Sequence, residues 1–313
     1  MQKGRPSART GLRLIAISML AMGLAACSSS GRGTMSLLLE QEKTAIQKKV
    51  ASSIGSTPEE MKRAFDSSEA TDRKRAQQVA AKTVARYGRS DDKAMQAHLQ
   101  RVTDRLASAI ESGSTGYKVM LVKDDQVNAF TPGGGIIVVH EGLLSFTDTE
   151  GQIAAVLAHE IAHVLQKHPY RLRQFRLASK AGGSLMDAIT PDVVKDNLGK
   201  VVRLGGKASI NAAIRRQEAE ADSIAIDLLV AAGYDPNEMV SVQRQLMTYV
   251  PQSSRLANMI YGQHPLSKDR VVAAERKIAK YYPDVQGQVT SAQFEKLIRG
   301  YQQRRLKRLA SKL

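Results

Sequence analysis

Apolar residues recur every three or four positions in several parts of the chain, which is the spacing of a helix with one buried face. Residues 94–110 show this spacing first, and they predict an amphipathic helix at the start of the compact domain. The same reasoning predicts helices at about 149–167, 207–232 and 268–282, the last with Ser267 as its N-cap. The pattern therefore favours a chain that is mostly helical.

Two short apolar runs between these helices indicate strands. They are residues 117–122, YKVMLV, and residues 135–140, GIIVVH, and both are rich in β-branched side chains. The stretch between them, 123–134, contains Asp, Asn, Pro and Gly, which are typical of turns. The predicted fold class is α+β, mostly helical, with a small β-sheet beside the helix at 149–167.

The helix expected at 149–167 has recognisable signals at both ends. Thr147 and Glu150 have the spacing of a capping box, in which two side chains bond the first free N–H groups of a helix. The dipeptide His168-Pro169 is expected to end the helix, because proline cannot continue its hydrogen bonding.

The first 26 residues differ in character from the rest of the chain. A basic start and a short apolar run, LIAISMLAMGL, predict that residues 1–26 are a cleaved export signal. Residues 24–27, LAAC, resemble the lipobox of bacterial lipoproteins, which implies cleavage before Cys27 and lipid attachment to it. Cys27 is the only cysteine, so an internal disulfide is excluded. The alternative is a plain secretory signal with cleavage nearby.

The start of the chain and its charge bear on location and partners. Ser28 stands where an aspartate would resemble the inner-membrane retention signal, so we expect an outer-membrane lipoprotein that faces the periplasm. No later segment has about 18 consecutive apolar residues, so the anchor is expected to be lipid. The net charge of +16 favours anionic lipid or lipopolysaccharide surfaces. Nucleic acid is not an expected partner of an exported chain, and the sequence indicates no oligomeric state.

The stretch LAHEIAHVL places two histidines four residues apart, with a glutamate directly after the first. On a helix His159 and His163 lie about 40° apart, so both imidazoles can share one cation. Glu160 can point at a metal-bound water, which is why this spacing suits zinc hydrolysis. A chance match on an ordinary helix is the alternative, so a second signal is needed.

That second signal is EAEAD, residues 218–222, on the helix expected at 207–232. Catalytic zinc usually has three protein ligands and an open position. Glu218 and Asp222 share one face, whereas Glu220 lies about 200° from Glu218. We therefore expect Glu218 to be the third ligand and Asp222 to orient a ligand histidine. The alternative is a solvated acidic patch.

The chain resembles a known family over about residues 92–282, namely the zinc metallopeptidases that include HtpX, LoiP and BepA. The resemblance implies a zincin-like fold and one Zn²⁺ per chain, with Glu218 as the third ligand. It also implies a LoiP-like lipoprotein plan, without the membrane helices of HtpX or the C-terminal helical repeats of BepA. The matching segments, in order, are NAFTPGGGIIVVHEGLL (128–144), HEIAH, EAEAD, AAGYDP (231–236) and HPLSKDR (264–270).

The resemblance implies two further roles. The glycine-rich strand would be an edge to which an extended substrate adds as a strand, with Asn128, Gly133, Gly134 and Gly135 in this segment. A hairpin turn is the plainer interpretation of the three glycines and is compatible with this role. His264 would reach the zinc as a fourth ligand and hold the enzyme at rest; the alternative is a hydrogen-bonded loop histidine.

The other histidines are not expected at the site. His168 would lie about 140° around the helix from His163 if the helix continued, so it should not join. His98 and His140 have no ligand partner at a useful spacing and are expected to be structural or exposed.

Four segments follow from these patterns. They are a lipoprotein signal peptide (1–26), a tether with a peripheral helical segment (27–91), the zinc metallopeptidase domain (92–282) and a basic C-terminal tail (283–313). The tail is interpreted either as a solvated charged helix or as a contact with an anionic membrane or a partner.

The function expected is that of a membrane-anchored zinc endopeptidase, which cleaves unfolded or misfolded envelope proteins as part of quality control. A zinc-activated water would attack the peptide bond, with Glu160 as the general base. Arg270 and Tyr261 are candidates for stabilising the oxyanion. The alternative is a lipid-anchored chaperone or assembly factor with a closed or structural zinc site.

Overall fold

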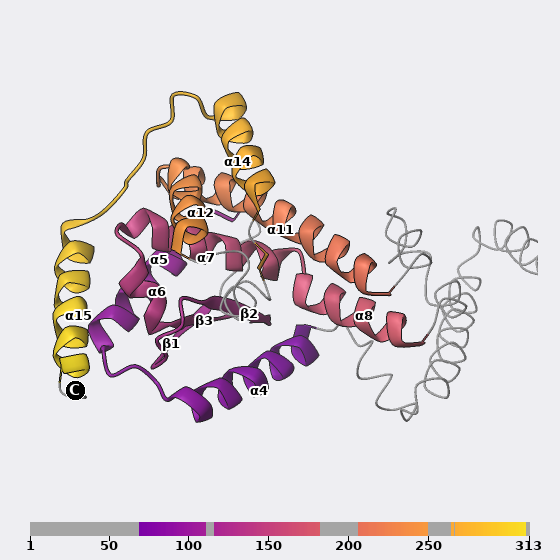
Figure 1. Ribbon diagram of the computed structural model, residues 1–313, viewed down its shortest axis with the longest axis horizontal. Coiled ribbons are helices and arrows are strands. Elements are labelled where there is room, and N and C mark those ends of the chain that lie inside the picture. Colours follow the sequence, from indigo (N-terminus) through magenta and orange to yellow (C-terminus); the bar gives the residue numbers. More distant parts are fainter. Residues whose placement is uncertain (1–68, 111–115, 182–205, 250–263, 266, 311–313) are drawn as a thin grey trace, which may run out of the picture.

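The computed structural model describes residues 69–110, 116–181, 206–249, 264–265 and 267–310. In this part of the chain a small sheet lies near the centre, with helices on both of its faces (Figure 1). No helix among the described residues is long and apolar enough to cross a membrane. The predicted fold class, a mostly helical α+β chain with a small sheet, is confirmed.

The sheet has three strands, β1 (Lys118–Val122), β2 (Ala129–Gly133) and β3 (Ile136–His140), in the order β1-β3-β2. β1 pairs parallel to β3, and β2 pairs antiparallel to β3. The two predicted strands are confirmed as β1 and β3. The prediction that only turns join them was wrong for β2, whose Pro132 and Gly133 are typical of turns. An edge strand tolerates such residues, because one of its sides is unpaired in the sheet.

Helices cover both faces of the sheet. α4 (Glu69–Tyr87) lies on one face, and α5 (Lys93–Ser108) and α7 (Glu150–Leu165) lie on the other (Figure 1). Side chains alternate along a strand, so β3 is buried from both directions. Alternate residues of β3 belong to two clusters: Ile136 and Val138 on the α4 side, and Ile137 and Val139 in the main core.

The N-terminus of α7 is capped by Thr149, and this corrects the predicted capping box. Thr149 Oγ1 accepts the N–H of Gln152 at 3.1 Å, and Gln152 Oε1 accepts the N–H of Asp148 at 2.7 Å. Thr147 lies two residues too early and donates its hydroxyl to a carbonyl of the preceding helix. Glu150 is the first residue of α7 and binds other side chains instead of a free N–H group.

The end of α7 also differs from the prediction. The helix stops at Leu165, and Lys167 has a positive φ of 52°, which turns the chain out of its helical path. α8 (His168–Ala181) begins at the next residue, so His168-Pro169 starts a helix instead of ending one. Proline is common in a first turn, because the N–H that it lacks has no intrahelical partner there.

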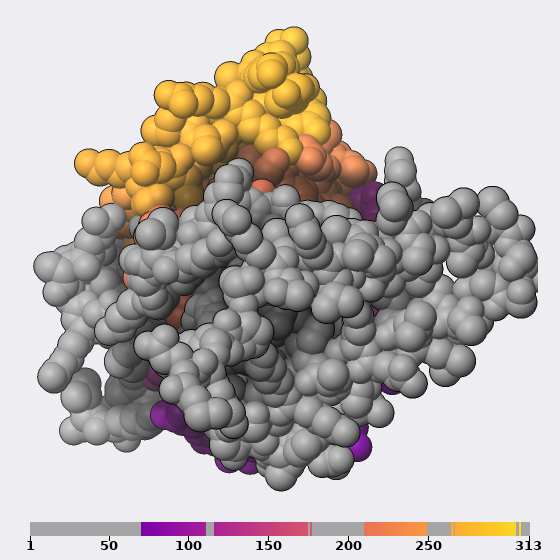
Figure 2. All heavy atoms as spheres, turned by 90° about the vertical axis from the view of Figure 1, so that its right-hand side faces the viewer, coloured from indigo at the N-terminus to yellow at the C-terminus, as the bar shows by residue number. Residues whose placement is uncertain are grey.

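α11 (Gly206–Ala231) lies along α7, and it is followed by α12 (Asn237–Tyr249) and α14 (Lys268–Tyr281). The helices expected at about 207–232 and 268–282 are confirmed as α11 and α14, to within one residue at each end. Ser267 caps α14 as predicted, since its hydroxyl accepts the N–H of Arg270. α14 stands at the top of the molecule in both views (Figure 1, Figure 2).

The last described helix, α15 (Ala292–Ala310), packs against α5 and α6 (Glu141–Phe146) (Figure 1). Phe294, Ile298 and Tyr301 on one face of α15 are buried in the main core. The basic tail is therefore a helix with one face in the core, and not a fully solvated helix.

Candidate active site

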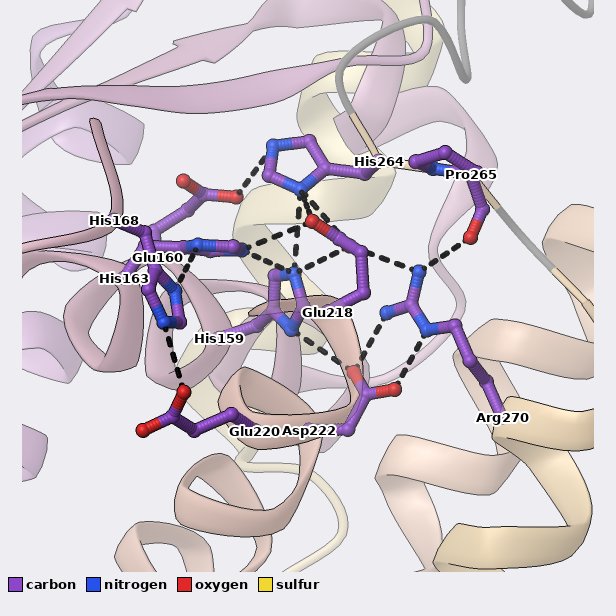
Figure 3. Close-up of polar contacts among 10 residues, drawn as sticks. All are labelled: His159, Glu160, His163, His168, Glu218, Glu220, Asp222, His264, Pro265 and Arg270. Carbon is purple, nitrogen blue, oxygen red and sulfur yellow. Dashed lines mark hydrogen bonds and ion pairs between the residues drawn. The ribbon is translucent and has the colours of Figure 1, made fainter. Parts of the chain in front are cut away.

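α7 presents two histidines on one face, as their spacing predicts. The Nε2 atoms of His159 and His163 lie 2.9 Å apart (Figure 3). Both side chains are buried, and so are most of the residues around them on this helix. Packing of α7 in the core therefore fixes the direction of both rings.

α11 brings Glu218 to the same point. Its Oε2 lies 3.3 Å from His159 Nε2, and its Oε1 lies 3.4 Å from His163 Nε2. Glu218 is 1% exposed, so it is not part of a solvated acidic patch. Three side chains with possible donor atoms, from two packed helices, thus face one point.

His264, which lies shortly before α14, completes a group of four. Its Nδ1 is 3.1 Å from Glu218 Oε1 and 3.3 Å from His159 Nε2 (Figure 3). One ligand atom from each of His159, His163, Glu218 and His264 lies within 4.8 Å of all the others. Imidazole nitrogens and a carboxylate facing one point are the donor set of a zinc site, so these residues fit a divalent zinc ion.

The protonation of these donors also suits a cation. Burial alone would raise the pKa of Glu218, but His264 and His159 hold it well below its usual range. Burial lowers the pKa of His163, and the neighbouring histidines lower it further. An ionised carboxylate and a neutral imidazole are the forms that bind metal. Burial alone would lower the pKa of His159, whereas Asp222 and Glu218 raise it to about 10, so a bound cation would displace a proton there.

Asp222 supports His159 from behind, in contact with the ring nitrogen that faces away from Glu218. Its Oδ1 lies 2.9 Å from His159 Nδ1, a position from which it can orient that ring. Arg270 of α14 binds the two oxygens of Asp222 at 2.6 and 2.7 Å. Burial alone would raise the pKa of Asp222, but Arg270 and His159 lower it to about 2.

Arg270 is the residue of this site whose role the sequence did not indicate. Its Nη1 lies 2.9 Å from Glu218 Oε2, in addition to the contacts with Asp222. The guanidinium is thus directed at the carboxylates of α11, and Arg270 also lines the cavity beside Glu160 and His159, so its role toward an oxyanion stays a prediction. No local spacing connects Arg270 to α11, so only its place in the HPLSKDR segment marked it. Tyr261, the other oxyanion candidate, lies outside the described residues.

Glu160 lies beside the donor group and is 1% exposed. Its Oε1 is 3.5 Å from His264 Nε2. Its Oε2 is buried and has no hydrogen-bond partner among the described residues. A buried carboxylate oxygen without a partner is costly, and here it is placed to accept a proton from a molecule that enters the site.

A cavity of about 80 Å³ adjoins Glu160 and His159. Asn128, directly before β2, lines this cavity, so the start of the edge strand lies next to the donor group. Most of the other walls are apolar, and they include Val127, Leu143, Val156, Met239 and Leu246.

Of the three glycines of the predicted substrate strand, Gly133 ends β2, and Gly134 and Gly135 form the turn to β3. Gly133, Gly134 and Gly135 all have positive φ, in agreement with the hairpin interpretation. A Cβ on Gly134 would lie 2.6 Å from the Cα of Arg73, so the close backbone approach here is that of α4. Pairing of a substrate with β2, an edge strand of the described sheet, stays a prediction.

The positions of the remaining histidines agree only in part with those expected from the sequence. His98 and His140 are each buried against a carboxylate away from the donor group, so the prediction of structural roles is confirmed. His168 is not among the four donor residues, but its ring contacts that of His163 at 2.8 Å between the Nδ1 atoms, although the helical angle placed the two side chains apart. The reason is that α7 ends before His168, so the helical angle does not apply.

Comparison with known proteins places this arrangement in a family. The model of Peptidase family M48 matches residues 93–278, which is more than half of the chain. The Beta-barrel assembly-enhancing protease of Escherichia coli (strain K12) is 31% identical over 187 residues, which are 58% of this chain and 38% of that protein. Metalloprotease LoiP of the same strain is 30% identical over 175 residues, 55% of this chain and 66% of that protein.

A mitochondrial protein is similar to this chain to a comparable extent. The Mitochondrial metalloendopeptidase OMA1 of Schizosaccharomyces pombe is 28% identical over 189 residues, 60% of this chain and 53% of that protein. The chain thus covers between 38% and 66% of the length of these three relatives. The range matched by the family model contains both zinc motifs and His264, and the resemblance drawn from the sequence is confirmed. The chain belongs to peptidase family M48.

Proposed function

We propose that this chain is a zinc metalloendopeptidase that cleaves unfolded or misfolded proteins of the cell envelope. The observation that carries the proposal is the meeting of His159, His163 and Glu218 at one buried point, with the partnerless Oε2 of Glu160 beside it. Membership of family M48 supports the same activity.

The roles of the side chains follow from their positions. His159, His163 and Glu218 would hold one Zn²⁺, which supplies an activated water and polarises the scissile carbonyl when bound. Glu160 accepts the proton of the attacking water at its Oε2 and passes it to the leaving amine. Asp222 keeps His159 in the orientation that directs Nε2 at the other donors. The buried surroundings keep bulk water from competing for these groups.

The substrate in this proposal is an extended segment of an unfolded protein. β2 lies at the edge of the described sheet, and the residue before it lines the cavity beside Glu160. A polypeptide that adds to this edge as a strand would run past Glu160, and only an unfolded segment has the free backbone groups to pair in this way. The name of one relative, the Beta-barrel assembly-enhancing protease of Escherichia coli, accords with envelope proteins as substrates.

The cellular place is proposed from the sequence. Cleavage before Cys27 and lipid attachment there would anchor the protein to the outer membrane, facing the periplasm. Cys27 lies outside the described residues, so this part of the proposal depends on the LAAC motif and the export signal alone. Mass spectrometry of the membrane-bound protein would detect the acyl groups on Cys27.

A test of the proposed mechanism is the substitution Glu160→Gln. The variant should keep its zinc, because Glu160 is not among the four donor residues, and its cleavage of unfolded casein should fall by roughly 10²–10⁴-fold. Glu295→Gln on α15 is the control for the same chemical change away from the site. Casein cleavage at the wild-type rate by Glu160→Gln would refute the mechanism.

One observation favours a second candidate, a lipid-anchored chaperone or assembly factor with a closed zinc site. His264 lies between Glu218 and Glu160, and Glu218 and Glu160 raise its pKa against the effect of burial. As a fourth ligand it would fill the open position that a catalytic zinc needs. His264→Ala separates the candidates: faster casein cleavage than wild type indicates a gated peptidase, and no cleavage by either form indicates the scaffold.

A further inference from the structure

His168 lies directly behind His163, on the side of the ring that faces away from the donor group (Figure 3). The Nδ1 atoms of the two rings are 2.8 Å apart, while Nε2 of His163 points toward Glu218. Nε2 of His168 lies 3.3 Å from Glu220 Oε2. His168 is 2% exposed, whereas the side chain of Glu220 is 37% exposed. A line of polar contacts therefore runs from the donor group to the surface.

Backbone geometry at Lys167 makes this contact possible. Lys167 is the only non-glycine residue with positive φ among the described residues, and this conformation costs about 1 kcal/mol for such a residue. It separates α7 from α8, so His168 starts a new helix and its ring points back at His163. On a continuous helix the two side chains would point in different directions. A left-handed residue just after the C-cap is a common way to end a helix, and here it sets the direction of the His168 ring.

The two histidines of α7 have different supports. Nδ1 of His159 lies 2.9 Å from the carboxylate of Asp222. Nδ1 of His163 instead contacts the imidazole of His168. The carboxylate on this side, that of Glu220, contacts His168 and not His163. A metal-binding histidine usually gives its second N–H to an acceptor that fixes its tautomer and direction. His168 is placed to be that acceptor.

We propose that His168 is a positioning residue that holds His163 for zinc binding, and that Glu220 fixes the tautomer of His168. Nδ1–H of His163 donates to Nδ1 of His168, and Nε2–H of His168 donates to Glu220. This arrangement leaves the lone pair of His163 Nε2 directed at the other donors. The inference rests on the proposed zinc site, and it adds two residues that do not touch the ion.

The experiment measures the apparent Kd for Zn²⁺ of the full chain, by competition with a chromophoric chelator. His168→Leu keeps the volume but removes the acceptor, and it should weaken zinc binding by about 10–100-fold. His168→Asn keeps an acceptor oxygen near the position of Nδ1, and its affinity should stay within a few-fold of wild type. The melting temperatures of the two metal-free variants should be similar, because the acceptor at position 168 affects the orientation of His163 for metal binding and not the stability of the metal-free fold.

Substitutions at two further positions, Glu220 and Lys167, test the outer parts of the arrangement. Glu220→Ala should weaken zinc binding several-fold, whereas Asp227→Asn on the same helix, away from the donor group, should not. Lys167→Gly relieves the backbone strain and should leave the affinity unchanged. Lys167→Val disfavours positive φ and should weaken zinc binding.

The possible results are distinct. Wild-type affinity in His168→Leu overturns the proposal, and so does an equal loss in His168→Leu and His168→Asn, since only packing would then matter. If His168→Leu does not fold, Glu220→Ala decides: an unchanged Kd overturns the proposal and a several-fold loss supports it. Absence of zinc binding in the wild-type chain would instead refute the zinc site itself.

Discussion

Arg270 lies buried between two carboxylates of α11. It binds both oxygens of Asp222, and its Nη1 is 2.9 Å from Glu218 Oε2. A buried charge is tolerated only with such partners, and removing one partner leaves the others uncompensated. Arg270 therefore fixes the side of α11 that carries the EAEAD motif and, through Asp222, the ring of His159.

Replacement of Arg270 should destabilise the protein strongly. Arg270→Met leaves the carboxylates of Asp222 and Glu218 without their cation, and we expect the free energy of unfolding of the metal-free protein to fall by about 3–5 kcal/mol. Urea denaturation measures this loss. Arg276→Met, at an exposed position of the same helix, is the control and should change stability little. Equal stability of the two variants would contradict the bridging role.

Helical spacing was sufficient to predict most residues of the site. His159, His163, Glu218 and Asp222 belong to two short motifs, so the angle of about 100° per residue determines which of them share a face. The same angle does not describe His168, because the chain leaves the helix at Lys167 and the ring of His168 contacts that of His163.

At the scale of elements, the N-terminus of α7 is held by a polar cluster around Glu150. Its carboxylate accepts hydrogen bonds from Tyr234 at 2.9 Å, Gln288 at 3.1 Å and Ser291, and His98 Nε2 lies 3.3 Å away. These partners come from separate parts of the chain. The cluster thus joins the helix that carries HEIAH to α5 and to the segments before α12 and α15.

This cluster predicts a dependence of stability on pH. Burial alone would raise the pKa of Glu150, but hydrogen bonds from His98, Ser291 and Tyr234 lower it to about 2. The usual glutamate pKa is about 4.3, so the ionised group stabilises the fold above that pH, and the effect disappears as the pH falls toward 2. The full effect is on the order of 3 kcal/mol.

Comparison with Glu150→Gln measures this contribution. The melting temperature of the variant should lie well below that of wild type at neutral pH, and the difference should shrink between about pH 5 and pH 2. The same difference at every pH would contradict the role of the ionised carboxylate.

The elements were predictable where one helix or strand carries its own signal. The helices α5, α7, α11 and α14 each have a clear apolar face or a local cap, and they were found. β2 was missed because Pro132 and Gly133 are tolerated only through its place at the sheet edge, which depends on tertiary pairing. The cap of α7 was placed at Thr147 because two threonines compete there, and local sequence does not decide between them.

At the scale of the whole molecule, α15 packs the end of the described chain against α5 and α6. Phe294, Ile298 and Tyr301 enter the main core, and the hydroxyl of Tyr301 donates to the carbonyl of Glu141 at 2.9 Å. The predicted domain boundary at 282 stays a prediction, and this packing supports an extension of the folded unit to include α15.

Phe294→Ala tests whether α15 belongs to the folded unit. Phe294 is fully buried, so its truncation should lower the free energy of unfolding by about 3–5 kcal/mol. Lys296→Ala, on the exposed face of the same helix, should change it by less than about 0.5 kcal/mol. Denaturant titration of both variants gives the comparison, and a loss in Phe294→Ala no larger than in Lys296→Ala would show that α15 is dispensable for the fold.

The overall fold class and family were predictable because several motifs occur in a fixed order over residues 92–282. The packing of α4 and α15 was not, since both helices lie outside the resemblance and their charged sequences hide a narrow apolar face. Only long-range contacts show which side of such a helix is buried.

The zinc content of the purified chain tests the central claim most directly. Inductively coupled plasma mass spectrometry of wild type should give one zinc ion per chain, and Glu218→Ala should lose most of it, because a donor from α11 is removed. Asp227→Ala, on the same helix but away from the donor group, should retain the ion. A full complement of zinc in Glu218→Ala, or none in wild type, would contradict the three-donor site.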